Sequence, residues 1–104
     1  MLIMSKVLRF EELDVWKEAR ACAKRIFEVT HEPAFPRDFG YISQINNAAG
    51  SVMDNIAEGF ERGGKKEFIQ FLSIAKGSCG EVKSQSYRAF DKKLISEEQH
   101  LRAK

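Results

Sequence analysis

Apolar residues recur every three or four positions over three long stretches of this chain, and prolines or glycines separate the stretches. This period is that of an amphipathic α-helix, which turns its apolar stripe toward a core. No stretch alternates apolar and polar residues as a half-buried β-strand does. The pattern therefore predicts an all-α protein, an up-down antiparallel helical bundle with three full helices plus a short or truncated fourth.

The first helix is predicted from about Glu11 to about Thr30. Its core stripe comprises Leu13, Trp16, Ala19, Ala23, Ile26 and Phe27, and Val15, Cys22 and Val29 widen it. Carboxylates at its start suit the positive end of the helix dipole. Pro33 and Pro36 in the following loop end this helix and prepare the next.

The second helix is predicted from about Arg37 to about Glu58, with Gly59 just past its end. Its stripe comprises Phe39, Ile42, Ile45, Ala49, Val52, Ile56 and Phe60. Gly50 costs roughly 1 kcal/mol of helix propensity relative to alanine. We therefore interpret Gly50 as a place where another helix backbone approaches closely. Residues 61–64 form the turn.

The third helix is predicted from about Lys65 to about Phe90, with apolar or small residues at 68, 71, 72, 75, 79, 82, 86 and 89. Gly77 and Gly80 are interpreted as close-packing sites. Ser96 and Gln99 form a capping-box pattern that announces a fourth helix. We treat residues 1–9 as an N-terminal tail and residues 10–104 as a single helical-bundle domain.

The composition indicates an ordinary soluble globular protein, since 43% of its 104 residues are hydrophobic and 31% are charged. A formal net charge of +2 is too small to indicate a dedicated nucleic-acid binder by itself. Cys22 and Cys79 form no C-x-x-C motif and are interpreted as small buried hydrophobes, not as a disulfide. No signal peptide or membrane-spanning run is recognised, so a cytoplasmic location is expected.

Residues along all three predicted helices and the second turn carry a family resemblance over about 10–95. They are Leu13 and Trp16, Ser43-Gln44-Ile45, Ala48, Ser51, Asn55-Ile56-Ala57-Glu58-Gly59, Arg62, Lys66-Glu67-Phe68, Phe71-Leu72, Ala75 and Gly77-Ser78. This combination resembles four-helix bundle proteins of the 23S rRNA intervening-sequence type, which are related to the accessory variability proteins of diversity-generating retroelements. The resemblance implies an up-down bundle, commonly a homopentameric ring, that binds nucleic acid or a nucleic-acid enzyme and is not itself a catalyst.

The chain departs from the family pattern at two places. Asn46 and Asn47 stand where the family usually carries arginines, which removes two cations that would attract phosphate. Members also normally complete a fourth helix, whereas only eight residues follow Ser96 here. Helices of that length need packing partners in order to be stable.

Basic residues form loose groups at helical spacing. The candidate residues for binding nucleic acid or a partner are Lys17, Arg20 and Lys24 on the outer face of the first helix; Arg62, Lys65 and Lys66 at the second turn; Lys76 and Lys83 on the third helix; and Gln44, Asn46 and Asn47 as uncharged hydrogen-bonding groups. One interpretation is a solvated face balanced by acidic neighbours. The other is a modest patch that a ring of subunits multiplies into a strong field.

Asn55, Glu58 and Arg62 share one helix face because they lie three and four residues apart. We interpret them as a local structural network, in which Glu58 pairs with Arg62 or Lys66 and Asn55 satisfies backbone groups at the turn. A binding site for a ligand or partner is the alternative. Trp16 and the phenylalanines, all at core spacing, are interpreted as packing residues and not as base-stacking platforms.

Catalytic signatures are weak. Two Glu-x-x-His pairs, Glu28 with His31 and Glu97 with His100, match part of the di-iron bundle pattern, with Asp38 and Asp91 expected nearby. The pairs fall at helix ends, so a metal-dependent enzyme is only a remote alternative and we expect no metal and no cofactor. No catalytic dyad or phosphate-cradling loop is recognised.

The sequence thus predicts a non-enzymatic, self-associating helical-bundle module that works with RNA, DNA, or a ribonucleoprotein or reverse-transcriptase partner. A structural protein–protein interaction module without nucleic acid is the alternative. No membrane association is expected.

Overall fold

A computed structural model describes residues 7–92 of the chain. It contains a short 3-10 turn, η1 (Phe10–Glu12), followed by the α-helices α2 (Asp14–Thr30), α3 (Phe39–Glu61) and α4 (Lys65–Asp91). Within 7–92 there is no β-strand, which confirms the all-α class. The helix predicted to begin at Ser96 lies outside the described residues.

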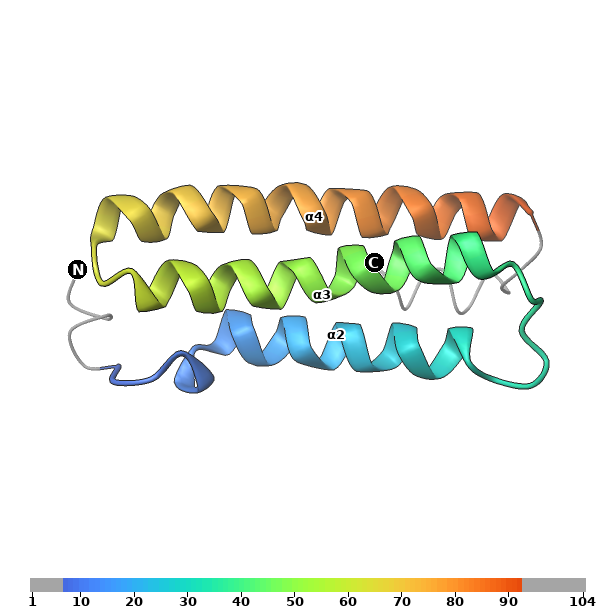
Figure 1. Ribbon diagram of the computed structural model, residues 1–104, viewed down its shortest axis with the longest axis horizontal. Coiled ribbons are helices and arrows are strands. Elements are labelled where there is room, and N and C mark those ends of the chain that lie inside the picture. The colour runs from blue at the N-terminus through green and yellow to red at the C-terminus, as the bar shows by residue number, and fades with distance from the viewer. Residues whose placement is uncertain (1–6, 93–104) are drawn as a thin grey trace.

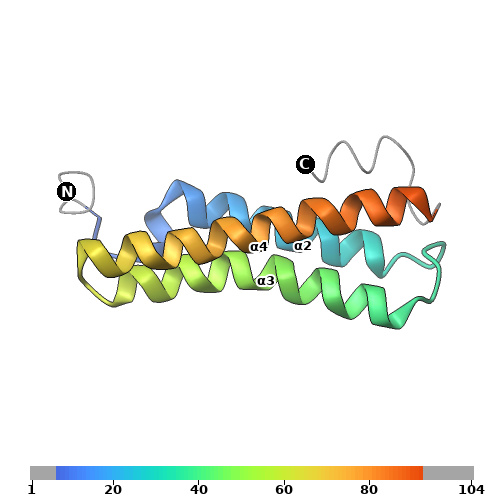
Figure 2. The same cartoon turned by 90° about the horizontal axis from the view of Figure 1, so that it is seen from above.

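The helix α3 lies in the middle of the arrangement, with α2 packed along one side and α4 along the other (Figure 1). The chain reverses direction at each connection, so consecutive helices are antiparallel. The turn between α3 and α4 lies at the end of the bundle where α2 begins (Figure 1). Figure 2 shows the same elongated arrangement from above, with the three helix axes roughly aligned.

The first helix begins later than the sequence predicts. The Glu12 carboxylate accepts hydrogen bonds from the backbone N–H groups of Leu8 and Arg9, at 3.1 and 3.0 Å, and this stabilises η1. Leu13 is then extended and buried, so α2 starts only at Asp14. An edge-to-face contact between Phe10 and Trp16, with ring centroids 5.2 Å apart, anchors η1 against α2.

Two clusters of buried apolar side chains hold the helices together. The cluster near the loop between α2 and α3 contains Ile26, Phe35, Tyr41, Ile45, Ala48, Ala49, Val82 and Ala89. The cluster near the turn between α3 and α4 contains Leu13, Ala19, Val52, Ile56, Phe68 and Ala75. Most of the predicted stripes therefore lie in the core, as the helical period requires.

Gly59 is inside α3 and buried, not past its end as predicted. A Cβ atom at this position would lie 2.5 Å from the Phe71 Cβ, so α4 approaches the α3 backbone closely here. Gly63 marks the end of the helix instead, because its φ of +80° is a left-handed conformation that favours glycine.

The close-packing interpretation of Gly50, Gly77 and Gly80 is wrong in this structure. In the described part of the chain, a Cβ added at any of them would meet no atom within 4 Å beyond the nearby backbone of its own helix. Gly77 and Gly80 are exposed because they occupy the side of α4 that faces away from α3.

Four residues that the stripes assigned to the core are exposed: Val15, Phe27, Phe39 and Cys79. The exposed fraction is 54% for Phe27 and 66% for Phe39. Val15, Phe27 and Phe39 lie in the first or last turn of their helices, where fewer neighbouring side chains cover them, and Cys79 lies at the margin of its stripe. Cys22 is half-buried, both cysteines are free thiols, and burial raises the pKa of Cys22.

Tyr41 is a core residue that the sequence stripe missed. It is buried, and its hydroxyl donates a 2.8 Å hydrogen bond to the backbone carbonyl of Gln85, which joins α3 to α4. Asp38 is the N-cap of α3, and its carboxylate accepts a hydrogen bond from the Tyr41 N–H at 3.2 Å. An aspartate before an apolar run is the sequence signal for such a helix start. This cap starts α3 two residues later than predicted.

Stability should fall at alkaline pH through Tyr41. Burial raises the pKa of Tyr41 to about 12, above its ordinary value of 10.0. Because the folded state holds this proton more tightly than the unfolded state, the contribution is complete below about pH 10 and disappears as the pH rises toward about 12. Urea unfolding at about pH 9 and pH 11 should show a smaller loss in Tyr41→Phe than in the wild type. Equal losses in both proteins would contradict the assignment.

No helix in the described part of the chain combines the length and apolarity that crossing a membrane requires.

Candidate nucleic-acid interface

The outer face of α2 carries Lys17, Arg20 and Lys24, all of them exposed. The guanidinium of Arg20 lies over the Trp16 ring, 5.7 Å from its centroid. Within residues 7–92 none of these cations forms an ion pair. The acidic residues Asp14 and Glu18 lie on another face of the helix, and Glu28 borders this one. The face therefore presents cations that are available to an anionic partner.

The cations at the turn between α3 and α4 are more constrained. Arg62 is the C-cap of α3, donates to the Glu58 carboxylate at 2.8 Å, and lies over the Phe71 ring, 5.1 Å from its centroid. Lys65 and Lys66 are exposed in the first turn of α4. Glu58 offsets the charge of Arg62, and the exposed Glu61 and Glu67 balance the two lysines, so this turn carries no net positive charge.

Lys76 and Lys83 are exposed on α4, two helical turns apart. Because α2 and α4 pack on different sides of α3, the predicted cations do not merge into one patch in a single copy of the chain (Figure 1). They form separate groups on α2, at the turn and on α4.

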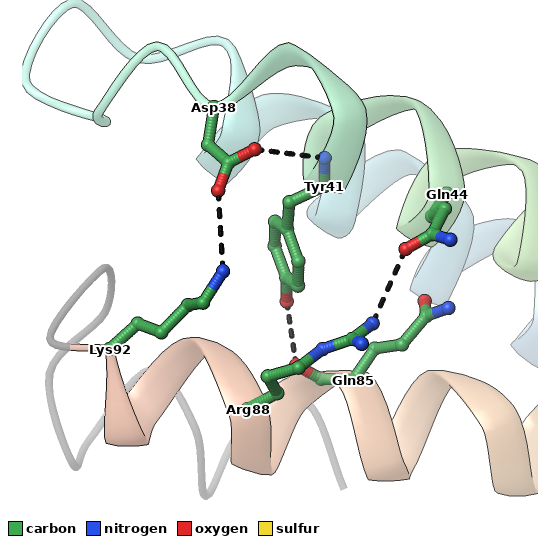
Figure 3. A network of polar contacts seen from close by, with 6 residues as sticks. All are labelled: Asp38, Tyr41, Gln44, Gln85, Arg88 and Lys92. Atoms are coloured by element: carbon green, nitrogen blue, oxygen red, sulfur yellow. Dashed lines mark hydrogen bonds and ion pairs between the residues drawn. The ribbon is translucent and has the colours of Figure 1, made fainter.

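The three uncharged candidates differ in how free their side chains are to bind a partner. Asn47 is exposed on α3, whereas Gln44 accepts a hydrogen bond from Arg88 at 3.3 Å (Figure 3). The Asn46 amide donates to the Thr30 hydroxyl at 3.0 Å and to the Ile42 carbonyl at 2.9 Å. Both of its hydrogens are used inside the bundle, so Asn46 holds α3 to α2 and has no donor left for a phosphate.

Asn55 acts one turn earlier than predicted. Its amide donates to the Ser51 carbonyl at 2.8 Å and to the Ser51 hydroxyl at 2.9 Å, and not to the backbone at the turn. The Ser51 hydroxyl lies 3.0 Å from that of Ser78, so this network connects α3 with α4. Of the two partners that spacing allows for Glu58, the structure has Arg62.

Polar contacts also join α3 and α4 near the other end of the bundle (Figure 3). Asp38 lies 3.6 Å from the Lys92 ammonium, and Arg88 reaches Gln44 across the helix pair. The buried Gln85 Oε1 has no hydrogen-bond partner in the described structure. Since both signs of charge are present, this network suits helix pairing better than it suits anion binding.

His31 stacks on Phe27, with ring centroids 3.9 Å apart, and its Nδ1 lies 2.8 Å from the Phe27 carbonyl oxygen. No group of three or more His, Cys, Asp or Glu side chains that could hold a metal ion occurs among the described residues. Glu97 and His100, the other half of the predicted di-iron pattern, lie outside them.

Residues 11–104 match the family model described as 23S rRNA-intervening sequence protein. No curated protein matches the chain.

Proposed function

The chain belongs to the 23S rRNA-intervening sequence protein family, and on this basis we propose that it is a non-enzymatic module that associates with nucleic acid or a ribonucleoprotein. The observation that carries the proposal is the outer face of α2, where Lys17, Arg20 and Lys24 are exposed and have no ion-pair partner among residues 7–92. Cations of this kind displace the counterions condensed on nucleic-acid phosphates, and the release of those counterions favours binding.

Self-association is part of the same proposal. One copy carries a net charge of only +2, in scattered groups, so its field is weak. A homo-oligomer, such as the pentameric ring that the family resemblance implies, would repeat each group around the assembly and raise the local potential. Exposed Ile69 and Ile74 on α4 supply apolar surface for such contacts. We propose that residues from Ser96 onward form the short or truncated fourth helix of an up-down bundle, and that the protein acts in the cytoplasm.

A second candidate function is a protein-interaction module without nucleic acid, which the exposed isoleucines on α4 favour. A reverse transcriptase is a partner that belongs to the first candidate function, on the family resemblance. Under the second candidate, the lysines on α2 would be solvated surface residues that bind no partner.

A mobility-shift titration separates the two candidates. We expect the full chain to bind a labelled structured RNA at about 50 mM salt and to lose affinity steeply by about 200 mM, because its cations displace condensed counterions from the phosphates. Lys17→Gln combined with Lys24→Gln should weaken binding and flatten the salt dependence. Absence of binding to RNA and duplex DNA at low salt, together with an oligomeric mass from light scattering, would favour the interaction module instead.

A further inference from the structure

Phe27 is a large aromatic side chain with half of its surface in solvent. It is 54% exposed and lies in the last turn of α2. The His31 ring stacks on it with an interplanar angle of 21°. An exposed aromatic pair can be stacked upon by another flat ring. Exposed apolar surface of this kind often marks an interaction site.

Phe27 and His31 continue the row of cations on α2. Trp16, Arg20, Lys24, Phe27 and His31 follow one another at spacings of three or four residues, so they lie on one face. Together with Lys17 we call this face the aromatic–basic stripe. It contains two observed contacts of aromatic rings with cationic or π groups, Arg20 over Trp16 and His31 on Phe27.

Building on the proposed function, we propose that the aromatic–basic stripe binds single-stranded nucleic acid. Unpaired bases stack on the Phe27–His31 pair and on the Arg20 guanidinium, and Lys17 and Lys24 contact the phosphates. The stripe extends about 22 Å along α2, at 1.5 Å per residue, which is enough for several successive nucleotides.

The stripe suits single strands better than a duplex. A duplex hides the faces of its bases, so an exposed ring on a helix surface has nothing to stack against. Cations alone would bind the phosphates of a duplex equally well. The exposed aromatic rings would then contribute nothing to binding, and their contact with water is unfavourable. The alternation of rings with cations is what single-strand binding sites use.

The test uses the full chain, with a mixed-sequence single-stranded RNA oligonucleotide and a hairpin of equal length as probes. Trp16 is the only tryptophan, so quenching of its fluorescence reports binding at the stripe itself. We expect Phe27→Leu to weaken single-strand binding about 5- to 100-fold with an unchanged salt slope, because it removes stacking and not charge. Lys24→Gln should instead lower the salt slope by about 0.7.

Matched controls lie elsewhere on the surface. Phe39→Leu removes another exposed phenylalanine, and Arg37→Gln removes another exposed cation, neither of them on the stripe. Both should leave the affinity and the tryptophan signal unchanged.

Equal effects of Phe27→Leu and Phe39→Leu, or equal binding of hairpin and single strand, would overturn the proposed role of the aromatic–basic stripe while the proposed function stands. A change of oligomeric mass in Phe27→Leu would assign Phe27 to an interface between copies and also overturn it. Absence of all nucleic-acid binding would overturn both proposals.

Discussion

Gly59→Ala should lower the free energy of unfolding by about 1–3 kcal/mol. The added methyl would lie 2.5 Å from the Phe71 Cβ and 3.3 Å from the Phe68 Cδ1, and neither atom can move without shifting a helix or a buried ring. This overpacking outweighs the gain in helix propensity that alanine brings. Urea denaturation monitored by circular dichroism measures the difference.

Gly77→Ala is the matched control, since it places the same substitution on α4 where no atom of residues 7–92 outside the helix's own backbone lies within 4 Å. It should raise the free energy of unfolding by up to about 1 kcal/mol. The two alanines are thus expected to act in opposite directions. A destabilised Gly77→Ala would show that another copy covers the outer face of α4, and an unchanged Gly59→Ala would contradict the close approach of α3 and α4.

Phe68→Ala should cost about 3–5 kcal/mol, the largest single loss that we predict. Phe68 is 5% exposed in the cluster with Leu13, Ile56 and Ala75, and it meets Phe60 edge-on at a centroid distance of 6.3 Å. Removing its ring leaves a cavity that the long helices around it cannot close. Thermal and urea unfolding should both show the loss.

Phe39→Ala is the corresponding control. Phe39 belongs to an apolar stripe in the sequence just as Phe68 does, yet it is 66% exposed. Its replacement should change the free energy of unfolding by less than about 0.5 kcal/mol. A large loss at Phe39 would indicate that this ring is buried in the assembled protein.

The proposed function depends on what the fold leaves outside the core. The basic residues of α2 were recognisable from their spacing, and the structure leaves them exposed and without ion-pair partners in the range 7–92. The exposure of Phe27 was not recognisable, because a phenylalanine next to Ile26 at core spacing is normally buried. Its exposure places an aromatic ring beside the cations of α2, so this surface can offer stacking as well as charge.

Helical spacing predicted which stretches are helices, where the connections fall, and most of the two core clusters. This succeeds because the period of 3.6 residues is a local property of the backbone, and each apolar stripe must meet some neighbour. The candidate cations were also placed correctly on helix surfaces, since long charged side chains are rarely buried without a partner.

Other features depended on how the helices meet. Spacing specifies the direction in which a side chain points but not which neighbour it meets, so it could not separate Gly59, pressed against Phe71, from Gly77, open to solvent. It could not show that the Asn46 amide donates to Thr30 and Ile42, or that the Tyr41 hydroxyl donates to the Gln85 carbonyl on α4. The sequence by itself determined the helices and their apolar faces. Only the tertiary structure decided which margins of those faces stay exposed, because that depends on the number and closeness of the neighbouring helices.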